Sequence, residues 1–130
     1  MKNIVIAIVF GFFTLGQAQT FTEQDTLRGS ITTERAWWDL NYYHLDIDVN
    51  PDDNFISGSN TIRYKVLEPH QVLQVDLQAP LLIEKASQDG KILEIVHKGN
   101  AHFIQLEKQQ KIGEFNEIIV TYSGHPKEAV

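Results

Sequence analysis

Hydrophobic and polar residues alternate strictly along the segment from Tyr42 to Val49. Tyr43, Leu45 and Ile47 hold odd positions together with Val49, while the even positions are tyrosine, histidine and aspartate. Successive side chains of a β-strand point to opposite faces, so the segment is predicted as a strand with one apolar and one wet face. The Asn-Pro-Asp-Asp sequence that follows is typical of a turn, and a β-hairpin is therefore expected.

Short alternating segments separated by turn residues continue along the rest of the chain. The dipeptide Asp89-Gly90 predicts a tight hairpin turn. Gly58, inside a strand, predicts either a bulge or the close approach of another backbone. No apolar period of 3.6 residues extends beyond about two helical turns. The expected fold class is all-β, an antiparallel saddle-shaped sheet or sandwich of about seven or eight strands. After the first strand, the others are predicted over residues 55–66, 73–77, 81–87, 92–97, 103–106 and 114–122.

Residues 1–18 have the features of a secretory signal peptide. Lys2 supplies the positive charge, an apolar run extends from Ile4 to Leu15, and Gly16 and Ala18 are the small residues of a cleavage site. The apolar run is shorter than the roughly 20 residues that span a bilayer. The alternatives are an uncleaved N-terminal anchor or a buried strand. Cleavage implies an exported protein, either periplasmic or secreted, with no membrane span after cleavage.

Residues 19–40 are polar and without a clean period, and an extended leader is expected there. Within it, a short helix could begin after Thr32. Trp37 and Trp38 close the leader, and we interpret them as packing the leader against the sheet, because aromatic side chains mostly contribute buried area. The alternative is a platform on which a ligand stacks. Residues 41–130 are assigned to the β domain.

Composition narrows the possible functions. The 130 residues are enough for one domain and carry a net charge of -6, or -7 over the 112 residues that remain after loss of Lys2 with the signal peptide. No basic patch suited to nucleic acid or anionic lipid is present. The absence of cysteine excludes cysteine–zinc, iron–sulfur and thiol-nucleophile chemistry. An exported domain without disulfides depends on its core or on a larger protein around it.

Histidines offer no metal motif. The five histidines never form His-x-x-x-His or His-Glu-x-x-His, the spacings that let two imidazoles reach one ion. His97 and His102 flank a predicted turn and could approach each other, but two ligands alone make a weak site. Solvated or edge histidines are the expected outcome. The set is His44, His70, His97, His102 and His125.

Carboxylates and serines also lack a catalytic arrangement. Asp46 and Asp48 share one strand face about 7 Å apart, and a bare acid pair on a wet face is not an acid/base device. The turn that carries Asp52 and Asp53 lacks the spacing of an EF-hand. Ser57 only superficially fits a nucleophile elbow, since it lies within a strand, and no Gly-rich phosphate loop is present. We therefore expect no catalytic, cofactor-binding or metal residues in this chain.

The order of several segments resembles the N-terminal domain of the M1 family of zinc aminopeptidases. The family pattern Tyr-x-Leu-x-Ile-x-Val-x-Pro is matched by residues 43–51, and an alternating strand with Phe55 and Gly58 follows the turn. Residues 73–77 resemble the next strand, and FNEIIVTYSGHP, residues 115–126, is similar to a later strand and turn. The leader DTLRGSITTERAWWDL resembles the lead-in of exported bacterial members. The resemblance covers about residues 25–130.

The resemblance implies a non-catalytic role. In the family, this domain packs on a thermolysin-like catalytic domain that binds zinc, and it helps to wall the substrate cleft. The family motifs His-Glu-x-x-His and Gly-x-Met-Glu-Asn are absent, so the chain by itself is not expected to be an enzyme or to hold zinc. We interpret it as a fragment, a truncated product or an N-terminal domain standing alone, incomplete at its C-terminus. Its expected partner is a catalytic domain or polypeptide.

One alternative remains open. The chain could be a free-standing exported β-sandwich module that binds peptide or glycan. In that case the binding surface would use aromatic residues, namely Trp37, Trp38, Tyr42 and Tyr43.

Overall fold

The computed structural model describes residues 20–128, so the signal peptide predicted over residues 1–18 lies outside the described residues. Seven strands form one sheet with the order β1-β2-β7-β4-β5-β6-β3, and every neighbouring pair is antiparallel. The predicted all-β antiparallel fold is confirmed. The strands are β1 (Trp38–Asn50), β2 (Phe55–Val66), β3 (Val72–Asp76), β4 (Leu82–Gln88), β5 (Lys91–Lys98), β6 (Ala101–Gln105) and β7 (Phe115–Gly124).

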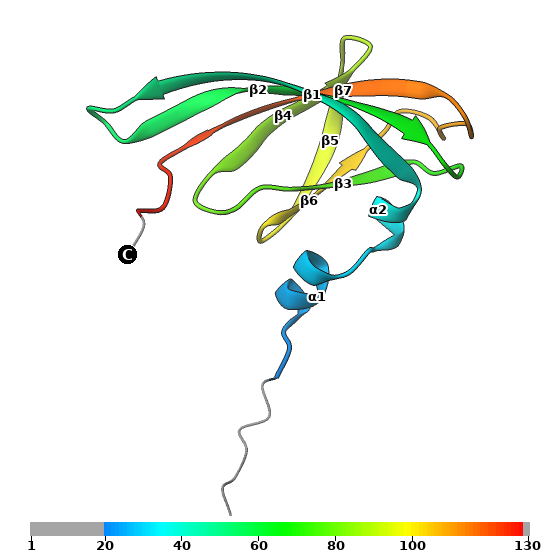
Figure 1. Ribbon diagram of the computed structural model, residues 1–130, viewed down its shortest axis with the longest axis horizontal. Coiled ribbons are helices and arrows are strands. Elements are labelled where there is room, and N and C mark those ends of the chain that lie inside the picture. The colour runs from blue at the N-terminus through cyan, green and yellow to red at the C-terminus, as the bar shows by residue number, and fades with distance from the viewer. Residues whose placement is uncertain (1–19, 129–130) are drawn as a thin grey trace, which may run out of the picture.

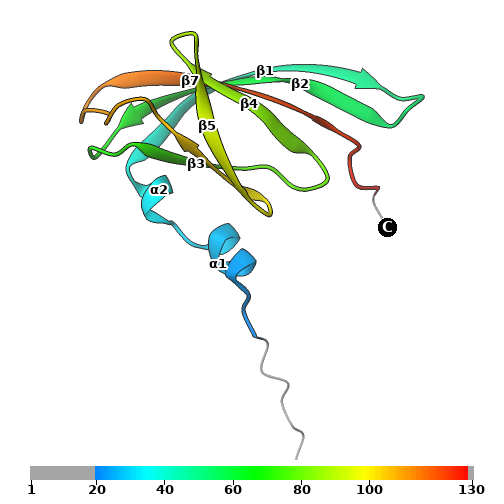
Figure 2. The same cartoon turned by 180° about the vertical axis from the view of Figure 1, so that it is seen from behind.

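The sheet is curled into a half-barrel. Figures 1 and 2 show β1, β2 and β7 crossing the top while β6 and β3 return beneath them. The two ends of the strand order, β1 and β3, therefore border the open side of the sheet. Within the described residues, no helix is long and apolar enough to cross a membrane.

The core fills the inner face of the curl. Along β2, the buried residues Ile62, Tyr64 and Val66 alternate with Arg63 and Lys65, which are exposed. This alternation is what one buried face and one wet face require. The other buried apolar residues of the cluster are Trp37, Leu73, Ile83, Ala86, Leu93, Ile104, Leu106, Ile118 and Val120.

Trp37 joins the two ends of the sheet. Its indole nitrogen donates a hydrogen bond of 2.7 Å to the carbonyl of Val72, at the start of β3. Its ring lies edge-on to Tyr64 of β2, with 5.6 Å between the ring centroids, and it is 1% exposed. The predicted packing role of the tryptophans is confirmed, since Trp38 also lies edge-on to Tyr64.

The leader over residues 19–40 was expected to be extended, and this expectation is wrong where the chain forms two helices. Helix α1 (Glu23–Gly29) precedes helix α2 (Thr33–Ala36), and β1 already begins at Trp38. Thr22 and Asp25 form a reciprocal capping box that stabilises the start of α1. Since α1 buries none of its residues, it has no apolar period, and that is why the pattern did not reveal it. The helix that was expected after Thr32 is confirmed as α2.

Gly58 lies where β1 and β2 approach closely. A Cβ atom at this position would lie 2.1 Å from the carbonyl oxygen of Asp46 on β1. The expected close approach is thus confirmed, while the bulge lies elsewhere, between Leu40 and Tyr42. The Asp89-Gly90 turn is also confirmed, with φ angles of 51° and 77° that suit a two-residue hairpin loop.

Gly58→Ala should destabilise the domain, because the added methyl group meets backbone rather than a movable side chain. We expect a loss of about 1–3 kcal/mol in the free energy of unfolding, the usual cost of overpacking. Urea denaturation followed by circular dichroism measures it. Gly29→Ala is the matched control, since nothing lies within 4 Å of its Cβ position. Equal stability of the two variants would contradict the close approach.

Candidate functional site

The inner face of the β1–β2 hairpin is apolar and open. Tyr43, Leu45, Ile47 and Val49 point to the same side of β1, and each is between 46% and 60% exposed. The buried core ends at Ile62 on β2 and at Val120 on β7. The β1–β2 hairpin extends to the side of the sheet, as Figure 1 shows. The apolar face predicted from the alternation is therefore present, but nothing in the described part of the chain covers it.

A hollow of about 290 Å³ lies under this face. Its volume is close to the lower end of the range for ligand pockets, roughly 300–1,000 Å³. Five strands and the segment between β3 and β4 contribute to it, and its walls are mostly apolar. The lining residues are Leu45, Ile56, Asn60, Val75, Asp76, Leu77, Leu81, Ile83, Val120 and Tyr122.

Asn60 is one of two residues, with the ion-paired Asp76, that bring an amide or carboxylate group to the wall of the hollow. It pairs with Leu45 on one side and Val120 on the other, within the row of inward-facing residues. Among the described residues, its Oδ1 is the single buried side-chain nitrogen or oxygen that has no hydrogen-bond partner. Such an acceptor costs about 1–3 kcal/mol in stability. The unpaired acceptor therefore makes the isolated domain less stable than it would be with an apolar side chain or a hydrogen-bond donor at this place.

The outer face of the same hairpin is acidic. Asp46 lies opposite Ser59 and Asp48 opposite Ser57, so both carboxylates stand over a small, polar stretch of β2. Glu84 of β4 lies beside them and accepts a hydrogen bond from the Ser123 hydroxyl. The β1 strand therefore combines an apolar inner side with an acidic outer side.

The histidines lie in four separate places. His44 is beside Tyr42, His70 stacks on Trp37, and His125 lies edge-on to Phe55. Only His97 and His102 come together, with their Nδ1 atoms 2.7 Å apart. Within residues 20–128, no group of three or more histidine, cysteine, aspartate or glutamate side chains is arranged to hold a metal ion.

His102 is a buried and neutral member of the His97–His102 pair. Burial is the main factor that lowers its pKa from the ordinary 6.5, with a smaller contribution from His97, while the backbone of Leu77 acts in the opposite direction. Its Nε2 lies 3.4 Å from the Leu77 carbonyl oxygen. With the Nε2 proton directed at that carbonyl, Nδ1 of His102 is left to accept a hydrogen bond from His97 Nδ1.

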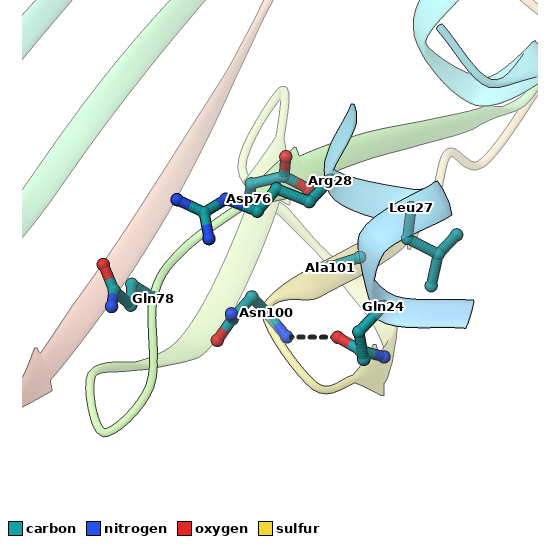
Figure 3. Close-up of a pocket in the computed structure, with 7 residues that line it drawn as sticks. All are labelled: Gln24, Leu27, Arg28, Asp76, Gln78, Asn100 and Ala101. Carbon is teal, nitrogen blue, oxygen red and sulfur yellow. Dashed lines mark hydrogen bonds between the residues drawn. The ribbon is translucent and has the colours of Figure 1, made fainter. Parts of the chain in front are cut away.

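A second, smaller pocket lies between α1 and the end of the sheet (Figure 3). It holds about 140 Å³, and Gln24 spans it, since its Oε1 accepts a hydrogen bond from the Asn100 backbone. Its Nε2 donates to the carbonyl of Lys98. Asp76, on the pocket wall, forms an ion pair with Arg35. These contacts make the pocket a packing seam between helix and sheet rather than a ligand site.

Of the four aromatic residues considered as a binding platform, only Trp38 and Tyr43 lie together, along the wall of one pocket. Trp37 is buried, and the indole of Trp38 donates to the Glu34 carbonyl. Tyr42 and Tyr43 are exposed on opposite faces of β1. The four aromatic residues therefore do not form one stacking platform.

Asp52 and Asp53 lie in the hairpin turn, where they interact with the Asn50 side chain.

Comparison with solved structures finds M1 zinc metallopeptidases. A mutant of the Deinococcus radiodurans enzyme bound to a Tyr-Ser-Ala substrate matches with a TM-score of 0.65 at 22% identity, over 74% of this chain and 22% of that chain. The same enzyme without the mutation matches with a TM-score of 0.64, also at 22% identity, over 71% of this chain and 21% of that chain. The chain has the fold of one part of these peptidases. The resemblance read from the sequence is confirmed at the level of the fold.

The same likeness extends to a two-domain M1 zinc metallopeptidase mutant bound to L-tryptophan. That structure matches with a TM-score of 0.63 and 22% identity, over 71% of this chain and 21% of that chain. The chain therefore spans about a fifth of the length of the peptidases it resembles. No known protein family and no curated protein matches the sequence.

Sequence reasoning did not find the hollow. Its walls come from five strands and a loop that only the curl brings together. One signal was available in β2, where Ile56, Gly58, Asn60 and Ile62 share the inner face and a polar amide interrupts the apolar residues. Such an interruption indicates a position where the inner face is not simply core.

Asn60→Leu should stabilise the isolated domain. The variant removes an acceptor that has no donor and replaces it with an apolar side chain of similar size. We expect a gain of about 1 kcal/mol in the free energy of unfolding, measured by urea denaturation. The matched variant Asn60→Asp, which puts a charge at the same place, should lose stability. A less stable Asn60→Leu protein would mean that Oδ1 has a partner in solution.

Acid should weaken the fold through His102. Because burial lowers the pKa of His102 in the folded state, the unfolded chain binds the proton more readily. The stability from the neutral ring is complete above about pH 6.5 and is lost as the pH falls through the folded-state pKa. We expect the melting temperature to fall between pH 7 and pH 5. His102→Gln should flatten this dependence, and His44→Gln, at an exposed position, should not. Equal slopes in both variants would contradict the role of His102.

Proposed function

We propose that this chain is the non-catalytic N-terminal β domain of an exported M1-type zinc aminopeptidase. Its role is to pack on a catalytic domain and to help shape the substrate cleft. Zinc and the hydrolytic residues belong to the catalytic domain of that parent enzyme. Cleavage after residue 18 delivers the protein to the periplasm or the extracellular medium.

The open apolar face of β1 is the observation that carries this proposal. Contiguous apolar surface of this kind is uncommon on an isolated soluble domain and marks a contact with another polypeptide. Here Leu45, Ile47 and Val49 form it together with the hollow beneath them. A domain that completes itself against a neighbour needs such a surface.

The proportions of the structural match support the same interpretation. The matched part makes up 22% of the Deinococcus radiodurans chain bound to Tyr-Ser-Ala. In a parent of that kind, most of the polypeptide lies outside the matched region and is available as the neighbour.

The alternative is a free-standing exported module that binds peptide or glycan. Tyr42 and Tyr43 are its exposed aromatic residues, but they lie on opposite faces of β1, which disfavours a single stacking platform. The nucleotide sequence after the codon for Val130 separates the two proposals. An adjacent frame that encodes His-Glu-x-x-His supports the peptidase domain, and unrelated genes support the module.

Expressed alone, the chain should bind an apolar fluorescent dye at the inner face of β1. Leu45→Ser combined with Ile47→Ser should remove most of the dye fluorescence, because it makes that face polar. Ile92→Ser with Val96→Ser is the matched control, since these exposed residues lie elsewhere, on β5. Metal analysis should find no stoichiometric zinc, and aminoacyl reporter substrates should not be hydrolysed. A dye-silent monomer, or one tightly held zinc per chain, would contradict the proposal.

A further inference from the structure

β1 is a long strand with one free edge. It has 13 residues and pairs with β2 alone, because it ends the strand order. Beyond the bulge between Leu40 and Tyr42, its register with β2 is unbroken to Asn50. A strand at the edge of a sheet presents a row of unpaired backbone N–H and C=O groups. The half of β1 that carries the open apolar face is therefore also a template for another strand.

The hollow lies between the two edges of the sheet. Leu45 of β1 and Val75 of β3 both line it, although the two strands are at opposite ends of the strand order. Figure 2 shows the open side between these strands from behind. Anything that fills the hollow from this side lies directly beside the free edge of β1.

The first part of the β3 edge is already occupied. The Trp37 indole donates to the Val72 carbonyl, and the Thr32 hydroxyl donates to the Gln74 side chain. The leader therefore covers the beginning of β3. Within the described residues, no strand pairs with the free edge of β1 over residues 42–50. This difference makes β1 the edge that accepts a partner.

An extended segment suits this edge better than a helix does. A helix satisfies its backbone groups internally and leaves the edge groups of β1 unpaired. An added strand pairs with them and places alternate side chains over the hollow. Those inward side chains would join the row formed by Tyr43, Leu45 and Ile47 and should be apolar.

The outer face sets the charge of the segment. His44, Asp46 and Asp48 stand along the outer side of β1, so the outward side chains of an added strand lie beside two carboxylates. Opposite charges on neighbouring strands stabilise the pair, and like charges destabilise it. The segment should therefore alternate apolar residues with lysine or arginine.

We propose that the free edge of β1, over residues 42–50, takes up an extended segment in which apolar and basic residues alternate. The segment belongs to the peptidase polypeptide that neighbours this domain, and in this respect the inference rests on the proposed function. It adds an eighth strand to the sheet and covers the hollow. A second copy of this chain is a poorer occupant, because its β1 brings two further carboxylates to the outer face.

Synthetic peptides test the edge directly. The probes are labelled peptides of about ten residues, one alternating Lys and Val and one alternating Glu and Val. Fluorescence anisotropy with the full chain should show the Lys peptide binding at least about ten-fold more tightly, because its charge complements β1. Alternate N-methylation of the Lys peptide keeps the charge and blocks edge pairing, and it should abolish binding. Hydrogen exchange should show new protection over residues 42–50.

A charge reversal on the edge makes the test specific. Asp46→Lys combined with Asp48→Lys should reverse the preference so that the Glu peptide binds more tightly. Asp52→Lys combined with Glu94→Lys makes the same change in net charge at exposed positions outside this face, and it should keep the original preference. Circular dichroism of both variants confirms that each is folded.

Three results would overturn the proposal. One is equal binding of the N-methylated peptide, which would mean charge attraction without strand pairing. Another is dimerisation of the chain alone with protection at residues 42–50, which would identify a second copy as the occupant. The third is an absence of peptide binding. A downstream His-Glu-x-x-His frame together with no peptide binding would leave the peptidase-domain proposal intact and reject only the strand.

Discussion

One tryptophan holds the two ends of this sheet together. Trp37 enters from the leader just before β1, and its indole donates to the carbonyl that begins β3. Its own carbonyl accepts the backbone N–H groups of Leu67 and Glu68, after β2. A buried indole contributes apolar area to the core, and the hydrogen bond of its N–H group fixes the orientation of the ring. Because β1 and β3 are the first and last strands of the order, this contact gives the sheet its curl at one end.

The closed and open ends of the half-barrel follow from that contact. At the closed end Tyr64 is buried, and its hydroxyl donates to Gln110 and accepts from Gln88, while burial raises its pKa to about 12. At the open end the same inner face continues through Asn60, whose Oδ1 has no donor. Polar groups are thus satisfied where the sheet is closed and left unsatisfied where it opens. The hollow under β1 is a consequence of the curl rather than a separate feature.

The strands could be predicted from the sequence, but the curl of the sheet could not. Alternation predicted β2 at residues 55–66, and the Asp89-Gly90 turn was visible because left-handed backbone favours those residues. Helix α1 was missed because it buries nothing and therefore leaves no period. The apolar face of β1 was predicted, but alternation indicates which side is apolar and not what covers it. The hollow depends on contacts between strands far apart in sequence, which no local pattern contains.

The two faces of β1 determine which strands can pair with so long an edge. An exposed apolar strand invites pairing with its own copies, and charged side chains along the edge are one means of preventing it. Asp46 and Asp48 disfavour pairing of β1 with itself in the antiparallel registers that place these carboxylates opposite one another. The same carboxylates favour a basic partner strand. A single outer face can therefore exclude the wrong neighbour and select the right one, while the apolar inner face supplies most of the affinity.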